Sequence, residues 1–463
     1  MNYNTELINR MAQQMVEGMK QALQSQMEGN PPGILGVETM MRDLLRQVGA
    51  EALGQYLSSQ PSIPGPTIAC SCGGELRYQR KREATLLSVF GRVSYQRGYY
   101  AGCSCGEGHA PLDQRLGLTP GGMSAGLAEL LALAGIELAF GQSQRWVEKY
   151  LGFSVSENTI RAATEERGEQ QQVYEQDLEK HSQEEEWLQE RLRSVTKRPE
   201  RLYGSIDAAK VRIEARDPLE KAAQEEAWRD LKVGCWYELE KVPPAQRSSR
   251  QQQKYDREQA VYRAKDLHYY CDIADAKTFG KLVWARGCQA KADLAHELVF
   301  VCDGAIWIWN LVSLYYPQAV QIVDWYHALE HLEKIATLAW TSAMDRQVWL
   351  AGVTEALWNG QMQDVICACQ NLVGQCEKVQ GELNYFVNNV DRMQYARFRA
   401  AGYAIGSGTV ESACKQIVTQ RLKISGAQWE VDGAVRTAKA RAAWLSNQWD
   451  ELLQPRSALP LAA

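Results

Sequence analysis

The 463-residue chain contains no run of about 18–20 uncharged apolar residues, which is the length that a membrane-spanning helix requires. Its first residues lack a basic segment followed by an apolar one, so we expect no secretory signal and a cytoplasmic location. Twelve cysteines are too few for a disulfide scaffold in a chain of this length, and metal binding or burial is the better expectation. Hydrophobic residues make up 45% and charged residues 23%, a balance that excludes disorder throughout.

The chain also lacks the positive net charge that is common in nucleic-acid-binding proteins, because its formal net charge is −5. This charge is unevenly distributed. Residues 165–190 carry ten acids and two bases, so the rest of the chain sums to +3, and residues 391–445 hold nine Lys or Arg and four acids. A local basic surface matters more for phosphate contact than the net charge of the whole chain. The acidity therefore does not exclude a nucleic-acid partner.

Repeats of 20–50 residues and low-complexity tracts are lacking too, and changes in periodicity divide the chain into six parts. These are a helical region (1–60), a cysteine-containing β domain (66–112), a helical helix-turn-helix domain (113–168), an acidic and solvated linker helix (169–199), an α/β domain (200–450) and a tail (451–463). Within the α/β domain, residues from about 328 to 404 show only helical periods. We therefore predict an α/β fold that carries an all-α insertion.

The α/β domain places acidic residues at the ends of its apolar segments. Strands are predicted at 201–211, 231–239, 267–273, 297–301 and 319–323, and helices at 276–290, 305–315 and 409–421. Asp207, Asp303 and Asp324 each close a strand, and Glu411 lies in the first turn of the last helix. Carboxylates from separate strand ends and a helix can converge on two Mg²⁺ ions and support phosphodiester chemistry. The alternative is that each Asp merely caps the helix that follows it.

Local motifs surround these acids. They are Ser205-Ile-Asp207, Val301-Cys-Asp303-Gly-Ala-Ile-Trp307, Asp324-Trp-Tyr-His327, Gly406-Ser-Gly-Thr-Val-Glu411-Ser and Arg421-Leu-Lys423-Ile-Ser-Gly426-Ala-Gln-Trp429. In this order, the motifs resemble DDE transposases with an RNase H-like core. More narrowly, they resemble bacterial insertion-sequence transposases of the ISKra type, which are related to Mutator-like transposases. The resemblance covers roughly residues 60–450.

The resemblance implies an RNase H-like catalytic core over residues 200–450, preceded by helical, zinc-ribbon-like and helix-turn-helix modules. It implies that Asp207, Asp303 and Glu411 hold two Mg²⁺ (or Mn²⁺) ions, and that Asp324 and His327 lie beside these metal ligands. The implied activity is cleavage and joining of DNA at the ends of the protein's own insertion sequence. The implied partners are terminal inverted repeats, target DNA and further copies of the chain on DNA, with association with the nucleoid and no membrane.

Four cysteines in the β domain form two close pairs, Cys70-Ser-Cys72 and Cys103-Ser-Cys105, each followed by Gly. Two such pairs suit a tetrahedral thiolate site for one Zn²⁺. The Cys-x-Cys spacing is tighter than the usual Cys-x-x-Cys, so a β domain that has lost its metal and a redox pair remain alternatives. Basic residues between the pairs predict contact with DNA; they are Arg77, Arg80, Lys81, Arg82, Arg92 and Arg97.

Further DNA-binding residues are expected in two places. A helix over 142–151, a break at Gly152 and a second helix opened by Ser156 form a helix-turn-helix pattern. Its second helix offers three residues near its N-terminus, where base-reading side chains lie, although plain helix packing is the alternative. These residues are Asn158, Thr159 and Arg161. After Glu411, contacts with DNA are expected from Lys415, Arg421, Lys423 and Trp429.

Two other functions stay open at this point. One is a non-catalytic DNA-binding regulator derived from a transposase, against which the intact set of three acids argues. The other is an RNase H-like nuclease without strand transfer, which only the resemblance separates from a transposase.

Overall fold

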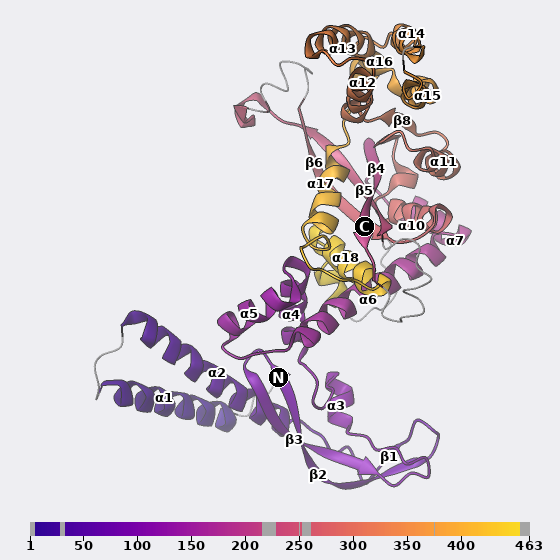
Figure 1. The fold of residues 1–463 in the computed structure, drawn as a ribbon. Helices are drawn as coiled ribbons and strands as arrows, with labels where there is room; N and C mark the ends of the chain where they lie inside the picture. Colours follow the sequence, from indigo (N-terminus) through magenta and orange to yellow (C-terminus); the bar gives the residue numbers. More distant parts are fainter. Residues whose placement is uncertain are drawn as a thin grey trace. The chain divides into compact units, whose positions relative to one another are not determined.

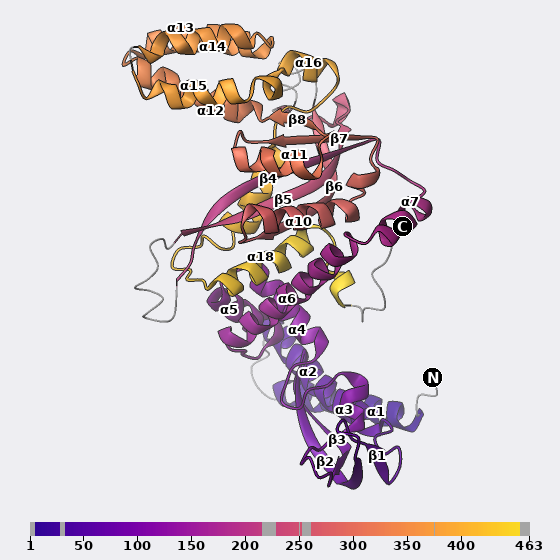
Figure 2. The same cartoon turned by 90° about the vertical axis from the view of Figure 1, so that its right-hand side faces the viewer.

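The computed structural model of the protein describes residues 5–27, 33–214, 228–249, 251, 261–374 and 376–453. The chain forms two compact units, Met1–Thr164 and Glu165–Ala463, which are drawn in Figures 1 and 2. It is a mixed α/β protein with two sheets, as the sequence predicted. Within the described ranges, no helix has the length and apolar character needed to cross a membrane.

The first unit combines helices with a three-stranded antiparallel sheet. Its first elements are α1 (Thr5–Met27), α2 (Ile34–Ser59), β1 (Thr67–Ala69), β2 (Glu75–Ser88) and β3 (Gly91–Ala101). Apolar residues at alternate positions of β2 and β3 pack with Leu57 of α2 and Leu112 to form the core of this unit. Strand β2 stays continuous through a β-bulge between Tyr78 and Arg80.

Four more helices follow in the first unit: α3 (Pro111–Leu116), α4 (Ala125–Glu137), α5 (Phe140–Leu151) and α6 (Glu157–His181), the last of which continues into the second unit. The predicted helix, turn and helix are present in α5 and α6. Gly152 ends α5 with a φ of 73°, a left-handed conformation that favours glycine. The Ser156 hydroxyl accepts a hydrogen bond from the Thr159 N–H at 3.2 Å and so caps the second helix.

The second unit is built on a five-stranded sheet. Its strands are β4 (Arg201–Arg212), β5 (Trp228–Lys241), β6 (Tyr262–Asp272), β7 (Glu297–Cys302) and β8 (Val320–Val323). They lie in the order β6-β5-β4-β7-β8. β4, β5 and β6 pair antiparallel, whereas β4, β7 and β8 pair parallel. All five predicted strands are confirmed, and β5 and β6 are longer than predicted.

Helices cover both faces of this sheet (Figure 1). They are α10 (Ala276–Gln289) and α11 (Ile306–Tyr315) on one face, and α17 (Gly408–Ala413), the π-helix Cys414–Thr419 and α18 (Val431–Leu445) on the other. On the first face, the Trp236 ring lies 5.1 Å from the Phe300 ring and 5.3 Å from the Tyr316 ring. On the second face, the rings of Tyr203 and Tyr237 stack at 5.6 Å. Helix α18 was not predicted, and the expected helix over 409–421 is shorter and ends in the π-helix.

The predicted all-α insertion is present between β8 and α17 (Figure 2). It contains α12 (Trp325–Ala339), α13 (Ala343–Trp358), α14 (Met362–Val373), α15 (Val379–Asn388) and α16 (Tyr395–Ala400). Its core is aromatic where it joins the sheet, because the Trp325 ring lies 5.0 Å from the Trp358 ring and 4.9 Å from the Tyr395 ring. These edge-to-face contacts fix the first helix of the insertion to its last one.

The acidic segment is not the solvated linker helix that the sequence predicted. Its residues form the second part of α6 and a separate helix α7 (Glu185–Ser194), and one side of α6 is buried. Glu175 is 3% exposed and its carboxylate lies 2.5 Å from the ammonium of Lys439 on α18. Asp272 lies 3.0 Å from the same ammonium. The prediction was wrong because the buried cation that compensates these acids comes from a helix more than 250 residues further along the chain.

Candidate functional site

Two of the three predicted catalytic acids lie side by side on neighbouring strands. The parallel register pairs Gly204 of β4 with Phe300 of β7, and Asp207 and Asp303 each lie three residues further along. Burial raises the pKa of Asp303, and the Asp207 carboxylate adds to this increase. Burial raises the pKa of Cys414, in the π-helix, and the nearby Asp207 carboxylate raises it further, a proximity that the sequence analysis did not predict. The two aspartates therefore form a partly buried acidic pair on neighbouring strands. Asp303 directly follows β7, as predicted, whereas Asp207 lies inside β4 and does not close it, because β4 continues to pair with β5 as far as Arg212.

The third acid, Glu411, groups with two other residues. Ligand atoms of Glu411, Asp324 and His327 all lie within 4.8 Å of one another. Asp207 and Asp303 do not join Glu411 in a group of that size, although Asp207 is close enough to affect the Glu411 pKa. Partial desolvation raises this pKa, and the Asp324 carboxylate raises it further. The structure thus places the predicted acids in two adjoining groups rather than in one tight cluster.

Asp324 joins the start of the insertion to the start of α17. Its buried carboxylate accepts a hydrogen bond from the His327 N–H at 2.8 Å and another from the Ser407 N–H. Next to it, the Trp325 N–H donates to the Ile405 carbonyl at 2.8 Å. Burial acts to raise the pKa of Asp324, but hydrogen bonds from His327 and Ser407 outweigh it, so the pKa is lowered. Asp324 therefore fixes the segment that leads to Glu411.

His327 carries a positive charge beside the acids. Its hydrogen bond to the Asp324 carboxylate raises the pKa of His327 to about 9, although burial opposes this effect. The ring is accordingly protonated at neutral pH. The protonated ring lies near Glu411 and Asp303, and its charge acts to lower the pKa of both carboxyl groups, against the effect of burial. Asp324 and His327 thus lie beside Glu411, one of the three acids that the resemblance implies as metal ligands.

The insertion brings a second set of polar side chains to Asp303. His331 of α12 hydrogen-bonds to Glu382, and its ring stacks on the Tyr385 ring at 3.6 Å. The Tyr385 ring packs so closely on Gly304 that a side chain at Gly304 would collide with it. Among the described residues, the buried Tyr385 hydroxyl has no hydrogen-bond partner. Sequence reasoning missed Glu382 and Tyr385, because nothing in α15 marks them as neighbours of an acid 80 residues away.

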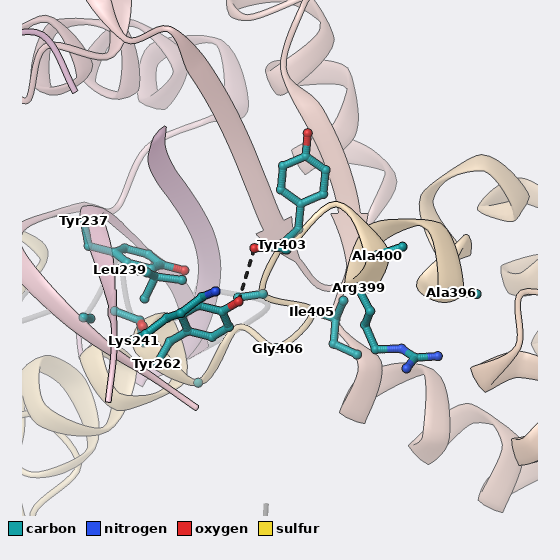
Figure 3. Close-up of a pocket in the computed structure, with 15 residues that line it drawn as sticks. Tyr237, Leu239, Lys241, Tyr262, Ala396, Arg399, Ala400, Tyr403, Ile405 and Gly406 are labelled. Carbon is teal, nitrogen blue, oxygen red and sulfur yellow. Dashed lines mark hydrogen bonds between the residues drawn. The ribbon is translucent and has the colours of Figure 1, made fainter. Parts of the chain in front are cut away.

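A cavity of about 650 Å³ lies beside the start of α17 (Figure 3). Strands β5 and β6 form one wall, and the segment from Ala396 to Thr409 forms the other. Its lining includes Tyr237, Leu239, Lys241, Tyr262 and Ile405, and none of the described residues that line it is Asp or Glu. The sequence analysis did not predict this cavity, because its two walls are more than 130 residues apart in the chain.

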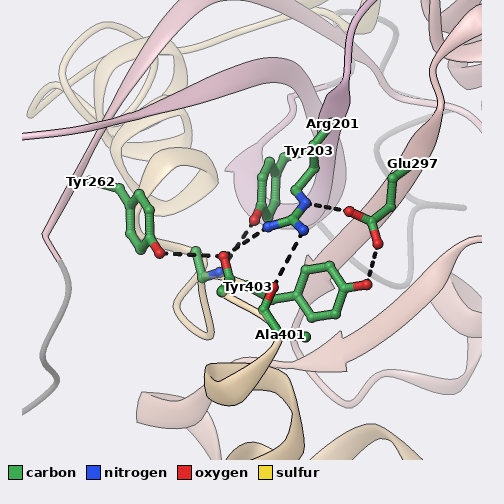
Figure 4. A network of polar contacts seen from close by, with 8 residues as sticks. Arg201, Tyr203, Tyr262, Glu297, Ala401 and Tyr403 are labelled. Atoms are coloured by element: carbon green, nitrogen blue, oxygen red, sulfur yellow. Dashed lines mark hydrogen bonds and ion pairs between the residues drawn. The ribbon is translucent and has the colours of Figure 1, made fainter.

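A polar network holds the second wall of the cavity in place (Figure 4). Arg201 forms an ion pair with Glu297 and donates a 2.8 Å hydrogen bond to the Gly402 carbonyl. The Tyr403 hydroxyl donates to Glu297, and the Tyr262 hydroxyl donates to the Gly402 carbonyl at 3.3 Å. Gly402 has a φ of 74°, which only glycine adopts without strain. Residues of β4, β6 and β7 thus fix the segment that precedes Glu411.

In the first unit, the four predicted zinc ligands converge. The Cys72 sulfur lies 3.4 Å from that of Cys70 and 3.3 Å from that of Cys103, and the Cys70 and Cys105 sulfurs are 3.5 Å apart. A tetrahedral zinc site with Zn–S bonds of about 2.3 Å has S···S edges of about 3.8 Å, only slightly longer. A Cβ atom at Gly74 would lie 2.7 Å from the Cys103 sulfur, so the absence of a side chain there makes room for the cluster.

The two cysteine pairs have the same turn geometry. The Gly73 N–H donates to the Cys70 carbonyl and the Gly106 N–H to the Cys103 carbonyl, both at 3.0 Å. Gly73 and Gly106 have φ values of 87° and 77°, so the glycine after each pair permits the turn. The Cys105 N–H and, after it, the neighbouring thiols lower the pKa of Cys103 to about 6, which favours a thiolate at neutral pH. The cluster can bind Zn²⁺, and this part of the cofactor prediction fits the residues present.

The predicted base-reading residues lie at the start of α6. Asn158 is exposed, whereas the Thr159 hydroxyl contacts the Ser156 hydroxyl at 2.8 Å, and Arg161 lies over the Phe140 ring at 5.4 Å. The sequence analysis overlooked Trp146 and Tyr150 of α5, which are 52% and 66% exposed and have ring centroids 5.5 Å apart. Both helices therefore present exposed side chains that can contact a partner.

Some of the predicted DNA contacts need correction. Arg421 is 2% exposed and lies 5.0 Å from the Trp429 ring, which is itself 6% exposed. Their side chains belong to the core of the second unit, because the indole of Trp429 also donates to the Leu422 carbonyl at 2.9 Å. Lys415 and Lys423 are exposed, as phosphate contact requires.

One of the predicted basic residues is buried, and one basic stretch lies largely outside the described residues. Arg97, one of the predicted basic residues of the β domain, is buried in an ion pair with Asp113 and is not available to DNA. Residues 247–257, a polar and basic stretch of the sequence that we also expect to form a loop, lie largely outside the described residues, as does most of the tail over 451–463.

Comparison with models of protein families finds no match for this chain, and comparison with curated proteins finds none either.

Proposed function

We propose that the protein is a DDE transposase with an RNase H-like core, which cleaves and joins DNA at the ends of its own insertion sequence. The observation that carries this proposal is the position of the three acids. Asp207 and Asp303 each lie three residues beyond the paired residues Gly204 and Phe300 of two adjacent parallel strands, and Glu411 lies on a helix that packs on the same sheet. The strand order β6-β5-β4-β7-β8 and the all-α insertion between β8 and α17 support it.

The donor set suits Mg²⁺ or Mn²⁺. Asp207, Asp303 and Glu411 would hold the ions through carboxylate oxygens, the ligands that these cations prefer. Partial burial raises the pKa values of Asp303 and Glu411, and neighbouring carboxylates raise them further, so a bound cation would stabilise the charged forms of these acids. Two such ions, when bound, would activate an attacking hydroxyl and stabilise the leaving oxygen.

The remaining residues position and balance these acids. Asp324 fixes the segment before Glu411 through Ser407, and protonated His327 partly offsets the negative charge that faces a DNA phosphate. Exposed Lys415 and Lys423 are proposed to contact phosphates, and Asn158 of α6 to read bases. Zinc bound by the four cysteines would stabilise the β domain. Copies of the chain are proposed to assemble on the two DNA ends.

The test uses DNA that flanks the gene, searched first for inverted repeats. Purified protein with Mg²⁺ should nick a labelled repeat end and join it to a target plasmid, and Asp303→Asn should remove both activities while binding persists. Cleavage without joining would instead identify an RNase H-like nuclease. Binding without cleavage by the wild-type protein would identify a regulator derived from a transposase.

A further inference from the structure

The cavity beside α17 has walls of different character. On β5, side chains alternate between the two faces of the sheet, so Tyr237, Leu239 and Lys241 all line the cavity. The two acids between them, Glu238 and Glu240, are not among the lining residues. They pair instead with Lys265 at 3.1 Å and Arg263 at 3.6 Å, the alternate residues of β6. The strand alternation therefore directs these two carboxylates away from the cavity.

Lys241 is a basic residue that the same alternation places in the lining of the cavity. Its ammonium forms no ion pair with any residue in the described ranges, unlike the neighbouring Lys265 and Arg263. The other basic residue in the lining, Arg399, stacks on Trp358 at 3.6 Å and donates to the Trp358 carbonyl. Figure 3 shows its guanidinium directed away from Tyr262 and Lys241. The side with Lys241 thus attracts an anionic group.

Tyr262 supplies a fixed aromatic surface next to this charge. Its hydroxyl donates to the Gly402 carbonyl at 3.3 Å, which anchors the ring at one end (Figures 3 and 4). Figure 3 shows the Lys241 side chain beside the ring. A flat ring and a nearby ammonium match a ligand that has an aromatic base and a phosphate. The volume of about 650 Å³ is enough for such a ligand.

We propose that this cavity binds one unpaired nucleotide, with its base on the Tyr262 ring and its phosphate at Lys241. The position indicates where the nucleotide comes from. Gly406, Gly408 and Thr409 line the cavity and lead directly into α17, which carries Glu411. This assignment rests on the proposed function: the nucleotide belongs to the DNA strand that passes Glu411, and its base is displaced from the partner base. A free mononucleotide has the same chemistry and is the other possible source.

The experiment measures DNA binding by the full-length protein by fluorescence anisotropy, without added Mg²⁺. The probes are a blunt 30-base-pair duplex and the same duplex with one unpaired 2-aminopurine nucleotide at its 3′ end. A third probe is deoxyadenosine monophosphate with a fluorescent anthraniloyl label. We expect the duplex with the unpaired nucleotide to bind about tenfold more tightly than the blunt one, the range that stacking of one base supplies. The 2-aminopurine emission should fall on binding because the base stacks on Tyr262.

The variants separate the cavity from general DNA binding. Tyr262→Leu and Lys241→Gln should remove the tenfold preference, whereas Tyr262→Phe, which keeps the ring, should retain most of it. Lys265→Gln is the matched control, since it removes a cation from β6 that does not line the cavity. Ala264→Trp, which fills the cavity from β6, should also remove the preference. Thermal melts of each variant confirm that it is folded.

Equal binding of both duplexes by the wild-type protein, with no binding of the labelled mononucleotide, would overturn the proposal. Tight binding of the mononucleotide that is lost in Tyr262→Leu, without any preference between the duplexes, would keep the site and assign it to a free nucleotide. Failure of the proposed function is measured separately, as loss of cleavage and joining or as absence of binding to either duplex, and in each case the mononucleotide measurement still tests the cavity.

Discussion

The side chain of Asp324, at the start of the insertion, accepts a hydrogen bond from the backbone N–H of Ser407, 83 residues further along the chain. The same carboxylate caps α12 through the His327 N–H. One buried side chain thus links the first helix of the insertion to the segment that carries Glu411. This link predicts that changes at Asp324 alter both stability and the position of Glu411.

Asp324→Asn tests this link. The Asn side chain can still cap α12, because its carbonyl oxygen accepts the hydrogen bond from the His327 N–H. Its NH2 group cannot accept the hydrogen bond that the Ser407 N–H donates to the second carboxylate oxygen. We expect a loss of about 1–3 kcal/mol in the free energy of unfolding, measured by urea denaturation, because a buried N–H loses its partner. Asp275→Asn is the control: Asp275 caps α10 in the same way but is exposed, so Asn should replace it at little cost. Equal effects of the two substitutions would contradict the role given to Asp324.

The buried ion pair between Glu175 and Lys439 predicts that α6 is an integral part of the second unit. Lys439→Met should lower the free energy of unfolding by about 3–5 kcal/mol, because it leaves Glu175 buried without its cation. Arg436→Met, three residues earlier, removes a more exposed ion pair with Glu169 and should cost at most about 1 kcal/mol. A small effect of Lys439→Met would indicate that the acidic helix is solvated after all.

The cysteine cluster predicts about one zinc per chain, measured by metal analysis of the purified protein. Cys103→Ser should abolish zinc retention and destabilise the first unit, whereas Cys367→Ser, at an exposed cysteine of α14, should change neither. Gly74→Ala should weaken zinc binding, because the added methyl group would press on the Cys103 sulfur. Gly381→Ala, where an added methyl group meets no atom within 4 Å, is the control. Zinc-free protein that is as stable as protein supplied with zinc would favour a domain that has lost its metal.

His268 predicts a loss of stability in acid. Burial, together with the charge of Arg286, lowers the pKa of His268 to about 4, whereas the unfolded chain has an ordinary value near 6.5. Between these values the unfolded state binds the extra proton, so stability falls as the pH decreases from about 6.5 to about 4. We expect His268→Gln to reduce this decrease by about 3 kcal/mol in urea denaturation at a series of pH values. A pH profile that is unchanged in His268→Gln would show that the ring titrates normally.

The sequence predicted those features that depend on local patterns. Alternating and helical periods located all five strands of the second sheet and the helical insertion, and the Cys-x-Cys-Gly pattern located the cysteine cluster. Burial of charged residues could not be predicted, because it depends on distant partners. Lys439 compensates Glu175, and Trp429 packs on Arg421, a residue that the basic pattern assigned to DNA. The cavity at Tyr262 likewise depends on two segments that the fold brings together.

The role of Glu411 is the most direct test of the proposed function, because the structure groups this residue with Asp324 and His327 as well as placing it near Asp207. The measurement is Mg²⁺-dependent cleavage of labelled end DNA by the wild-type protein, by Glu411→Gln and by the control Glu355→Gln, with DNA binding measured in parallel. Loss of a metal-binding carboxylate should reduce the cleavage rate at least about 100-fold, which corresponds to several kcal/mol of transition-state stabilisation, and leave binding intact. Glu355→Gln should cleave as the wild-type protein does. Cleavage by Glu411→Gln at the wild-type rate would contradict the assignment of this residue to a metal-dependent active site.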